Sequence, residues 1–277
     1  MEIILKKITS TITIYILALV VIIIFIFPII WLLLMSIKNP VDAFSIPPKL
    51  IFKPTFQYYY ILWFEKGFSK YFINSMIISL CTILISILIA SMGSFALTWY
   101  KKKISGIILI IVLVIRMFPK FALLIPFFYI SQMFGLFDSR TLIVAIMVAI
   151  NQPFAIWMMR GFFADVPHEF VDAARIDGCN IFEAFWRVVM PIMIPGLITA
   201  AIFTFLLAYN EFLVPLMLTS IKAKTLPVAI AEYGAEDIKY WSLSAAGAIS
   251  IAAPAVILIT FFQKYLVKGM MLGGIKE

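Results

Sequence analysis

Long runs of uncharged, hydrophobic residues alternate along this chain with short segments that carry charge. Five of these runs are close to or longer than the roughly 20 residues that cross a bilayer as a helix. They cover residues 8–37, 71–100, 141–159, 192–210 and 241–263. A further run, at about 104–130, is interrupted by charged residues. No strand-like alternation suggests a barrel, so backbone groups in lipid must be satisfied within helices.

We therefore predict an all-α polytopic membrane protein with six transmembrane helices in a single domain, residues 1–277. The three lysines at 101–103 favour the cytoplasm, which places both termini and a loop at 164–191 on the cytoplasmic side. Over the whole chain the lysine and arginine bias supports this orientation only narrowly. The spans are expected at about 11–36, 71–99, 104–130, 141–163, 192–218 and 241–263.

Composition agrees with a membrane protein and narrows the candidate chemistry. The chain is 64% hydrophobic and 13% charged, with a mean hydropathy of +1.09, which excludes an ordinary soluble domain. The net charge of +8 is assigned to lysines at the membrane surface and in loops, because no nucleic-acid module occurs. Cys81 and Cys179 are expected to be free thiols. His168 has no second ligand nearby in sequence, so no metal site is predicted.

The third expected span contains Arg116, Pro119 and Lys120. An arginine near the bilayer centre costs roughly 2.5–3.5 kcal/mol on insertion scales, so both cations should face the protein interior or water. Pro119 should break the helix between them. The alternative is a span that ends early, with both side chains snorkelling to the interface.

Polar residues in the third, fourth and fifth spans are candidates for a substrate path, although each could instead make a helix–helix hydrogen bond. From the rise of about 1.5 Å per residue, Lys120 and Glu211 should lie at similar depth and pair or share a polar cavity. The candidates are Arg116, Lys120, Asn151, Tyr209, Asn210 and Glu211.

Between Asp165 and Pro195 the chain becomes charged. Asp165 is a plausible N-cap for a helix of about eleven residues that Gly178 ends, and Asn180 with Glu183 matches a capping box on a second helix. Two short helices at a sharp turn would form a docking knob at the water boundary. Its small alanines would admit a partner's surface, and its charges would orient that partner. The alternative is an ordinary amphipathic connector.

The spacing within this segment resembles a known signature. Asp172-Ala173-Ala174 is followed by Gly178 four residues after the second alanine and by Pro191 thirteen residues after the glycine. This pattern resembles the cytoplasmic loop of membrane permeases of binding-protein-dependent ABC importers, with conservative changes at Asp172, Val188 and Met190. The resemblance implies a helix that lodges in a groove of an ATPase. It assigns that coupling to Glu169, Phe170, Asp172, Ala173, Ala174, Arg175, Asp177, Gly178 and Pro191.

Further motifs resemble the carbohydrate-import branch, and in particular the smaller permease of maltose-type systems. They are residues 154–157 (Phe-Ala-Ile-Trp), 160–163 (Arg-Gly-Phe-Phe), 208–212 (Ala-Tyr-Asn-Glu-Phe), 225–227 (Thr-Leu-Pro) and 263–265 (Gln-Lys-Tyr). The resemblance covers most of the chain after about Tyr71. It implies the type I ABC importer permease fold in a bacterial inner membrane, and import of sugars or oligosaccharides. The implied partners are a homologous second permease, an ATPase dimer that binds ATP and Mg, and an extracytoplasmic solute-binding protein.

No complete Walker A motif occurs, so the chain is expected to be no enzyme, to bind no cofactor and to obtain its energy from a partner. Two other classes stay open. An ion-coupled secondary transporter could use Glu211 with Arg116 or Lys120, and would transport alone under an ion gradient. The second open class is a membrane-embedded enzyme or channel, although the sequence shows no catalytic cluster. The same two cations leave open an anionic substrate, such as an acidic oligosaccharide or a glycerol phosphate, beside a neutral sugar.

Overall fold

The computed structural model describes residues 2–99, 102–236 and 240–272, with side chains described over 11–99, 103–233 and 240–265. Lys101 of the predicted lysine cluster and the residues from 273 onward lie outside these ranges. Every described element is helical, in agreement with the all-α prediction.

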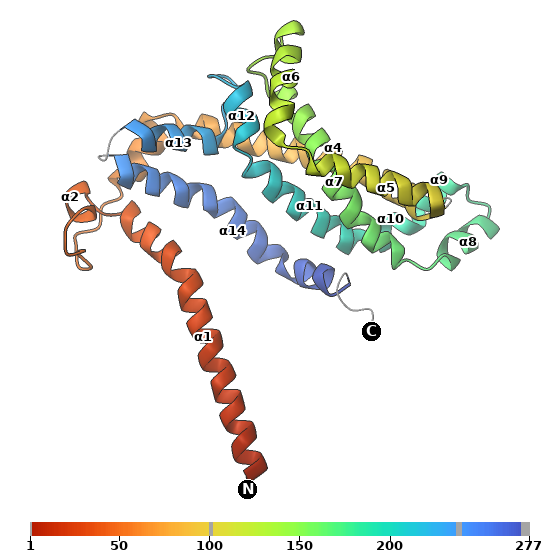
Figure 1. Ribbon diagram of the computed structural model, residues 1–277, viewed down its shortest axis with the longest axis horizontal. Helices are drawn as coiled ribbons and strands as arrows, with labels where there is room; N and C mark the ends of the chain where they lie inside the picture. Colours follow the sequence, from red (N-terminus) through yellow and green to blue (C-terminus); the bar gives the residue numbers. More distant parts are fainter. Residues whose placement is uncertain (1, 100–101, 237–239, 273–277) are drawn as a thin grey trace. The chain divides into compact units, whose positions relative to one another are not determined.

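Figure 1 shows these helices in chain order. The N-terminal elements are α1 (Glu2–Ser36), α2 (Pro40–Ala43), α3 (Gln57–Tyr60) and the π-helix η1 (Ile61–Glu65). The middle of the chain holds α4 (Phe68–Trp99), α5 (Lys102–Met117), α6 (Lys120–Met133), α7 (Arg140–Ala164), α8 (Glu169–Ile176), α9 (Ile181–Ala184) and the π-helix η2 (Phe185–Val189). The remaining helices are α10 (Met190–Ile192), α11 (Ile194–Tyr209), α12 (Leu213–Leu218), α13 (Leu226–Glu236) and α14 (Trp241–Leu272).

The chain divides into two compact units, and the first contains residues 1–68 and 230–252. After α1, Lys38 is 1% exposed, and its ammonium donates to the carbonyl oxygen of Lys49 at 2.6 Å. The same ammonium lies 5.3 Å from the ring centre of Trp31 and 4.9 Å from that of Phe52. Carbonyl and ring faces therefore satisfy a buried charge and fix the turn that follows α1.

The second unit contains residues 69–229 and 253–277 and carries the candidate site. Here α7 packs against α5 and α11, as Figure 1 shows. Near the start of α7, Ile143 and Met147 share a core with residues of α4, α6 and α12. Near its end, Met159 and Phe163 share another core with α4, α8, η2 and α11. Thus α7 connects two separate cores, one at each end.

Helix lengths agree with a membrane protein but differ from the expected spans at two places. Four helices are long and apolar enough to cross a bilayer, or up to six if two bent pairs each count as one span, among the described residues. The third expected span bends by 85° between Met117 and Lys120, where Pro119 lacks the N–H that would continue the helix. The fifth bends by 78° at its start, between Ile192 and Ile194.

The end of the fifth expected span also departs from a continuous helix. Helix α11 stops at Tyr209, and α12 begins only at Leu213. One carboxylate oxygen of Glu211, Oε1, accepts the backbone N–H of Leu213 at 3.2 Å, so the side chain satisfies an amide at the start of α12. The sequence pattern had suggested that Glu211 lies on a helix. In the structure it lies in a break between two helices.

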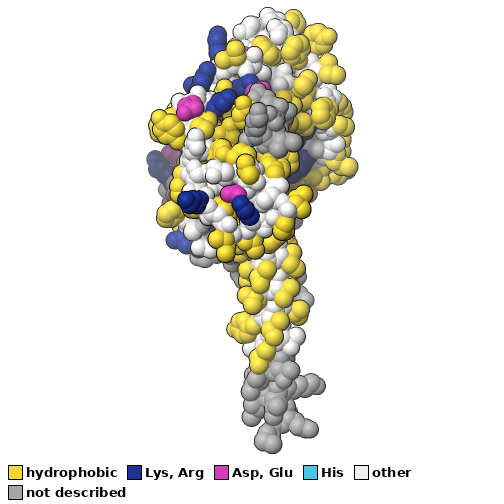
Figure 2. Space-filling model, turned by 90° about the vertical axis from the view of Figure 1, so that its left-hand side faces the viewer, with side chains coloured by type: hydrophobic (Ala, Val, Ile, Leu, Met, Phe, Trp, Pro, Cys, Tyr) yellow, Lys and Arg dark blue, Asp and Glu magenta, His cyan; other side chains and the backbone are white. Residues whose placement is uncertain are grey.

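Helix α1 exposes hydrophobic side chains along most of its length. Between Thr11 and Ile30 every side chain is exposed, and Figure 2 shows the hydrophobic residues along this segment. A soluble protein rarely exposes so large an apolar surface, which indicates contact with lipid or with another membrane subunit.

Candidate functional site

Helix α8 lies at the end of α7 and is anchored by one face. It runs over eight residues, Glu169–Ile176, and buries Val171 (3% exposed) and Ala174 (6%) in the core at that end. Other side chains of the helix are open, with Phe170 48% exposed beside this face and Ile176 86% exposed on the opposite one. A short helix is thus fixed to the unit while it offers apolar and charged groups outward.

Four aromatic rings hold this part of the unit together. Phe95 of α4 lies 4.6 Å from Trp99 and 5.0 Å from Phe185 of η2, measured between ring centres. Trp99 also lies 6.1 Å from Phe163 of α7, and 5.2 Å from His168, which precedes α8. Packed aromatic cores resist deformation, so these rings tie the start of α8 to α4 and α7.

The predicted limits of this helix need one correction. Asp165 is not an N-cap, because its backbone N–H bonds to the carbonyls of Phe162 and Phe163 and ends α7. The helix therefore begins at Glu169 and is shorter than the expected eleven residues. Gly178 ends it as expected, in the left-handed region with φ of 90°.

The second predicted helix is confirmed in its start. Asn180 Oδ1 accepts the N–H of Glu183 at 2.9 Å, and the Glu183 carboxylate accepts the N–H of Asn180 at 2.9 Å, which completes the capping box. Oε1 of Glu183 also lies 3.8 Å from a guanidinium nitrogen of Arg187.

Cys81 and Cys179 are free cysteines, as expected.

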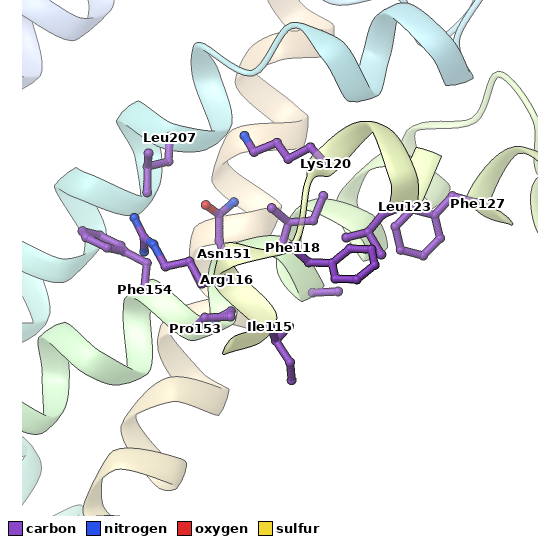
Figure 3. Close-up of a pocket in the computed structure, with 12 residues that line it drawn as sticks. Ile115, Arg116, Phe118, Lys120, Leu123, Phe127, Asn151, Pro153, Phe154 and Leu207 are labelled. Atoms are coloured by element: carbon purple, nitrogen blue, oxygen red, sulfur yellow. The ribbon is translucent and has the colours of Figure 1, made fainter. Parts of the chain in front are cut away.

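A cavity of about 310 Å³ lies where α5 bends into α6 and contacts α7 and α11. Three predicted path residues line it, namely Arg116, Lys120 and Asn151. In Figure 3 the Asn151 amide lies between the side-chain ends of Arg116 and Lys120. The expected pairing of Lys120 with Glu211 is confirmed, with Nζ 2.6 Å from Oε2.

Two other predicted path residues lie elsewhere. Tyr209 is 1% exposed, and its ring stacks on Phe205 at 5.1 Å between centres. Asn210 folds back on α11, where Nδ2 donates to the Leu206 carbonyl at 2.9 Å. Neither residue lines the cavity, and both make contacts within the α11 segment.

Comparison with known proteins identifies the family. A model described as "Binding-protein-dependent transport system inner membrane component" matches residues 82–272, more than half of the chain. The chain belongs to this permease family. The resemblance seen in the loop at 164–191 and in the motifs on either side of it is thereby confirmed.

Characterised relatives of this permease carry names of sugar transport systems. It is 33% identical to the trehalose transport system permease protein of Mycobacterium tuberculosis, over 90% of this chain and 92% of that protein. It is 32% identical to the sulfoquinovosyl glycerol transport system permease protein of Agrobacterium fabrum, over 90% and 88%. A chain from the crystal structure of a bacterial ABC transporter for import of the acidic polysaccharide alginate shares the fold, with a TM-score of 0.75 and 21% identity over 92% of the permease and 95% of that chain.

The sequence pattern of this permease did not reveal the ring that accompanies Arg116 in the cavity. The guanidinium carbon of Arg116 lies 4.7 Å from the ring centre of Phe154 on α7. Phe154 also contacts Phe203 of α11 at 6.1 Å between ring centres. The signal was present, because Phe154 follows Asn151 by three residues and shares its helix face.

The sequence pattern also did not reveal a polar clamp at the opposite end of α7 from α8. The two carboxylate oxygens of Asp138 accept the backbone N–H groups of residues 220–223 at 2.9–3.0 Å. Asn74 donates to the carbonyls of Lys222 and Lys224 at 2.9 and 2.8 Å, and it accepts from Arg140 at 2.8 Å. A lone aspartate in a turn gives no sequence signal for a partner more than eighty residues away.

Burial of Asp138 opposes its ionisation, but the four donated N–H bonds outweigh it and lower the pKa to about 2. The carboxylate is therefore ionised throughout the neutral range. It holds the loop between α12 and α13 against the turn before α7.

Proposed function

We propose that this chain is the permease subunit of an ATP-driven importer of sugars or oligosaccharides. It forms half of a translocation path beside a homologous second permease, and an extracytoplasmic solute-binding protein delivers the sugar. A cytoplasmic ATPase dimer supplies the energy and binds ATP and Mg, while this chain binds neither. Family membership and the relatives' names support transport of a sugar.

One observation carries the coupling role: α8 is a short helix held on one face and free on the other. Ala174 is buried in the aromatic core, whereas Ala173 next to it is exposed. A partner's groove could close on the Ala173 side without disturbing the core. Closure of the ATPase dimer would then move α8 with α4 and α7 as a rigid body and alternate the access of the path.

The proposal places both termini and α8 in the cytoplasm. The exposed charges of Glu169, Asp172, Arg175 and Asp177 would orient the ATPase surface. Gly178 ends α8, and Pro191 lies in the first turn of α10, which leads toward the fifth span. These two residues bound the second half of the coupling loop.

The test is the variant Ala173→Trp in the complex purified with its natural partners and reconstituted in liposomes. We expect normal insertion, but loss of the ATPase subunits from the complex or ATP hydrolysis without sugar uptake. Ala173→Ser is the matched control, because it keeps the helix narrow. Normal uptake by Ala173→Trp, or uptake by the chain alone under an ion gradient, would contradict the proposal.

A further inference from the structure

The cavity at the bend between α5 and α6 carries one cation without an acidic partner. Lys120 is neutralised by Glu211 at 2.6 Å. Arg116 forms no ion pair with any residue that the structure describes. Two cations and one carboxylate leave the cavity with a single positive charge.

The guanidinium of Arg116 is held in place by a ring face. It lies 4.7 Å from the centre of Phe154, whose ring is in turn fixed against Phe203. A guanidinium that uses its flat face on a ring keeps its N–H donors free at the edge. This edge matches a carboxylate with two parallel hydrogen bonds, and it matches sulfonate and phosphate oxygens in a similar way.

An unpaired guanidinium within a membrane span is energetically unfavourable unless a bound group neutralises it. Arg116 lies thirteen residues along α5 from Lys103, or about 20 Å at 1.5 Å per residue. A span that enters the bilayer at Lys103 would therefore place Arg116 beyond the middle of a core about 30 Å thick. An unpaired arginine at such a depth is unfavourable in a bilayer. An anionic ligand in the cavity would offset that cost.

The remaining cavity wall offers acceptors for hydroxyl groups. Asn151 donates its amide N–H to the Met147 carbonyl at 2.9 Å, which leaves its Oδ1 to accept. Pro153 has no N–H, so the carbonyl of Ala149, another lining residue, lacks its regular helical donor. Phe118 and Phe127 supply apolar surface. A cation, hydroxyl acceptors and rings together fit a sugar that carries an acid group.

We propose that this cavity binds an anionic saccharide, with its single negative group on Arg116 and its hydroxyls on Asn151 and the Ala149 carbonyl. This inference rests on the proposed function and names its substrate class. A cavity of about 310 Å³ is at the small end of ligand pockets, which span roughly 300–1,000 Å³. It therefore takes one acidic sugar unit at a time.

The test uses the complex purified with its natural partners, in liposomes of zwitterionic lipid so that no lipid headgroup supplies a net negative charge. The probes are three sets of oligosaccharides: uronic-acid oligosaccharides, their methyl esters, and neutral sugars of the same length. The readout is stimulation of ATP hydrolysis together with uptake. Arg116→Gln removes the charge, Arg116→Lys keeps it, and Lys53→Gln removes an exposed lysine elsewhere as the matched control.

We expect stimulation by members of the acidic set and not by their esters. Arg116→Gln should raise the half-stimulating concentration at least about tenfold, the loss that one charged hydrogen bond represents. Arg116→Lys should raise the half-stimulating concentration less than Arg116→Gln does, and Lys53→Gln should leave it unchanged. Stimulation by neutral sugars or esters alone, or no effect of Arg116→Gln on acidic sugars, would overturn this inference and leave the proposed function intact. If no saccharide of any set stimulates hydrolysis, the proposed function itself fails.

Discussion

The Lys120 ammonium lies 2.6 Å from Oε2 of Glu211 and joins two helix breaks in one unit. Lys120 is the first residue of α6, directly after the bend that follows α5. Glu211 lies in the interruption between α11 and α12, and its other oxygen accepts the N–H of Leu213. One carboxylate thus connects the wall of the cavity to the start of α12.

A double-mutant cycle measures this connection. We expect Lys120→Met and Glu211→Gln each to lower the free energy of unfolding in detergent, and the double variant to lose less than the sum. The coupling should be about 1 kcal/mol, because the Lys120 side chain is 47% exposed and partly screened by solvent. Glutamine at 211 can still accept from Leu213, so the cycle isolates the charge. Additive losses would show that the pair contributes nothing.

The clamp made by Asp138 gives a prediction at the opposite end of α7 from α8. Asparagine at position 138 offers one acceptor oxygen in place of two and turns an N–H₂ toward donors. We expect Asp138→Asn to speed amide hydrogen exchange at residues 220–223 at neutral pH, with α7 itself unchanged. Asp177→Asn, which changes an exposed acid beyond α8, is the control. Unchanged exchange in the loop would mean that other contacts hold it.

The same clamp predicts a dependence on pH. The folded pKa of Asp138 is about 2, below its ordinary value of 3.8. A lowered folded pKa means that the stabilisation is complete above about pH 4 and is lost as the pH falls toward 2. We expect protection of residues 220–223, corrected for intrinsic exchange rates, to stay constant from pH 7 to about pH 4 and then decrease. A decrease that begins near pH 6 would point to another group.

The sequence predicted features that depend on neighbours along the chain. The capping box at Asn180, the turn at Gly178 and the break at Pro119 follow from local backbone chemistry, and the structure contains all three. One distant contact was also predicted: the pairing of Lys120 with Glu211 was expected from similar depth in the spans, since a charge in lipid needs a partner. The family followed from the spacing of Asp172, Gly178 and the motifs after them.

Other features that depend on distant contacts were missed, for physical reasons. Asp165 looked like a helix start because it precedes a proline, but packing extends α7 up to it. The contact of Arg116 with Phe154 depends on how α5 packs against α7, which no local pattern specifies. The four amides on Asp138 come from a loop that only the completed fold brings near. Tertiary packing decided each of these.

Two glycines on neighbouring helices test how closely α7 and α11 pack. A Cβ atom built on Gly196 of α11 would lie 2.7 Å from Cγ and 3.0 Å from Cβ of Phe162 on α7. Those atoms are close to the backbone and cannot turn away cheaply. A Cβ on Gly161 of α7 meets nothing within 4 Å, and the position is exposed.

The two alanine variants should therefore change stability in opposite directions. We expect Gly196→Ala to lower the free energy of unfolding by about 1–3 kcal/mol, because overpacking forces Phe162 and α7 to shift. Gly161→Ala should raise it by about 0.5–1 kcal/mol, because alanine restricts the unfolded chain and favours the helix. Thermal unfolding of both variants in the same detergent measures the difference. A Gly196→Ala variant as stable as Gly161→Ala would show that α11 and α7 lie farther apart than the structure places them.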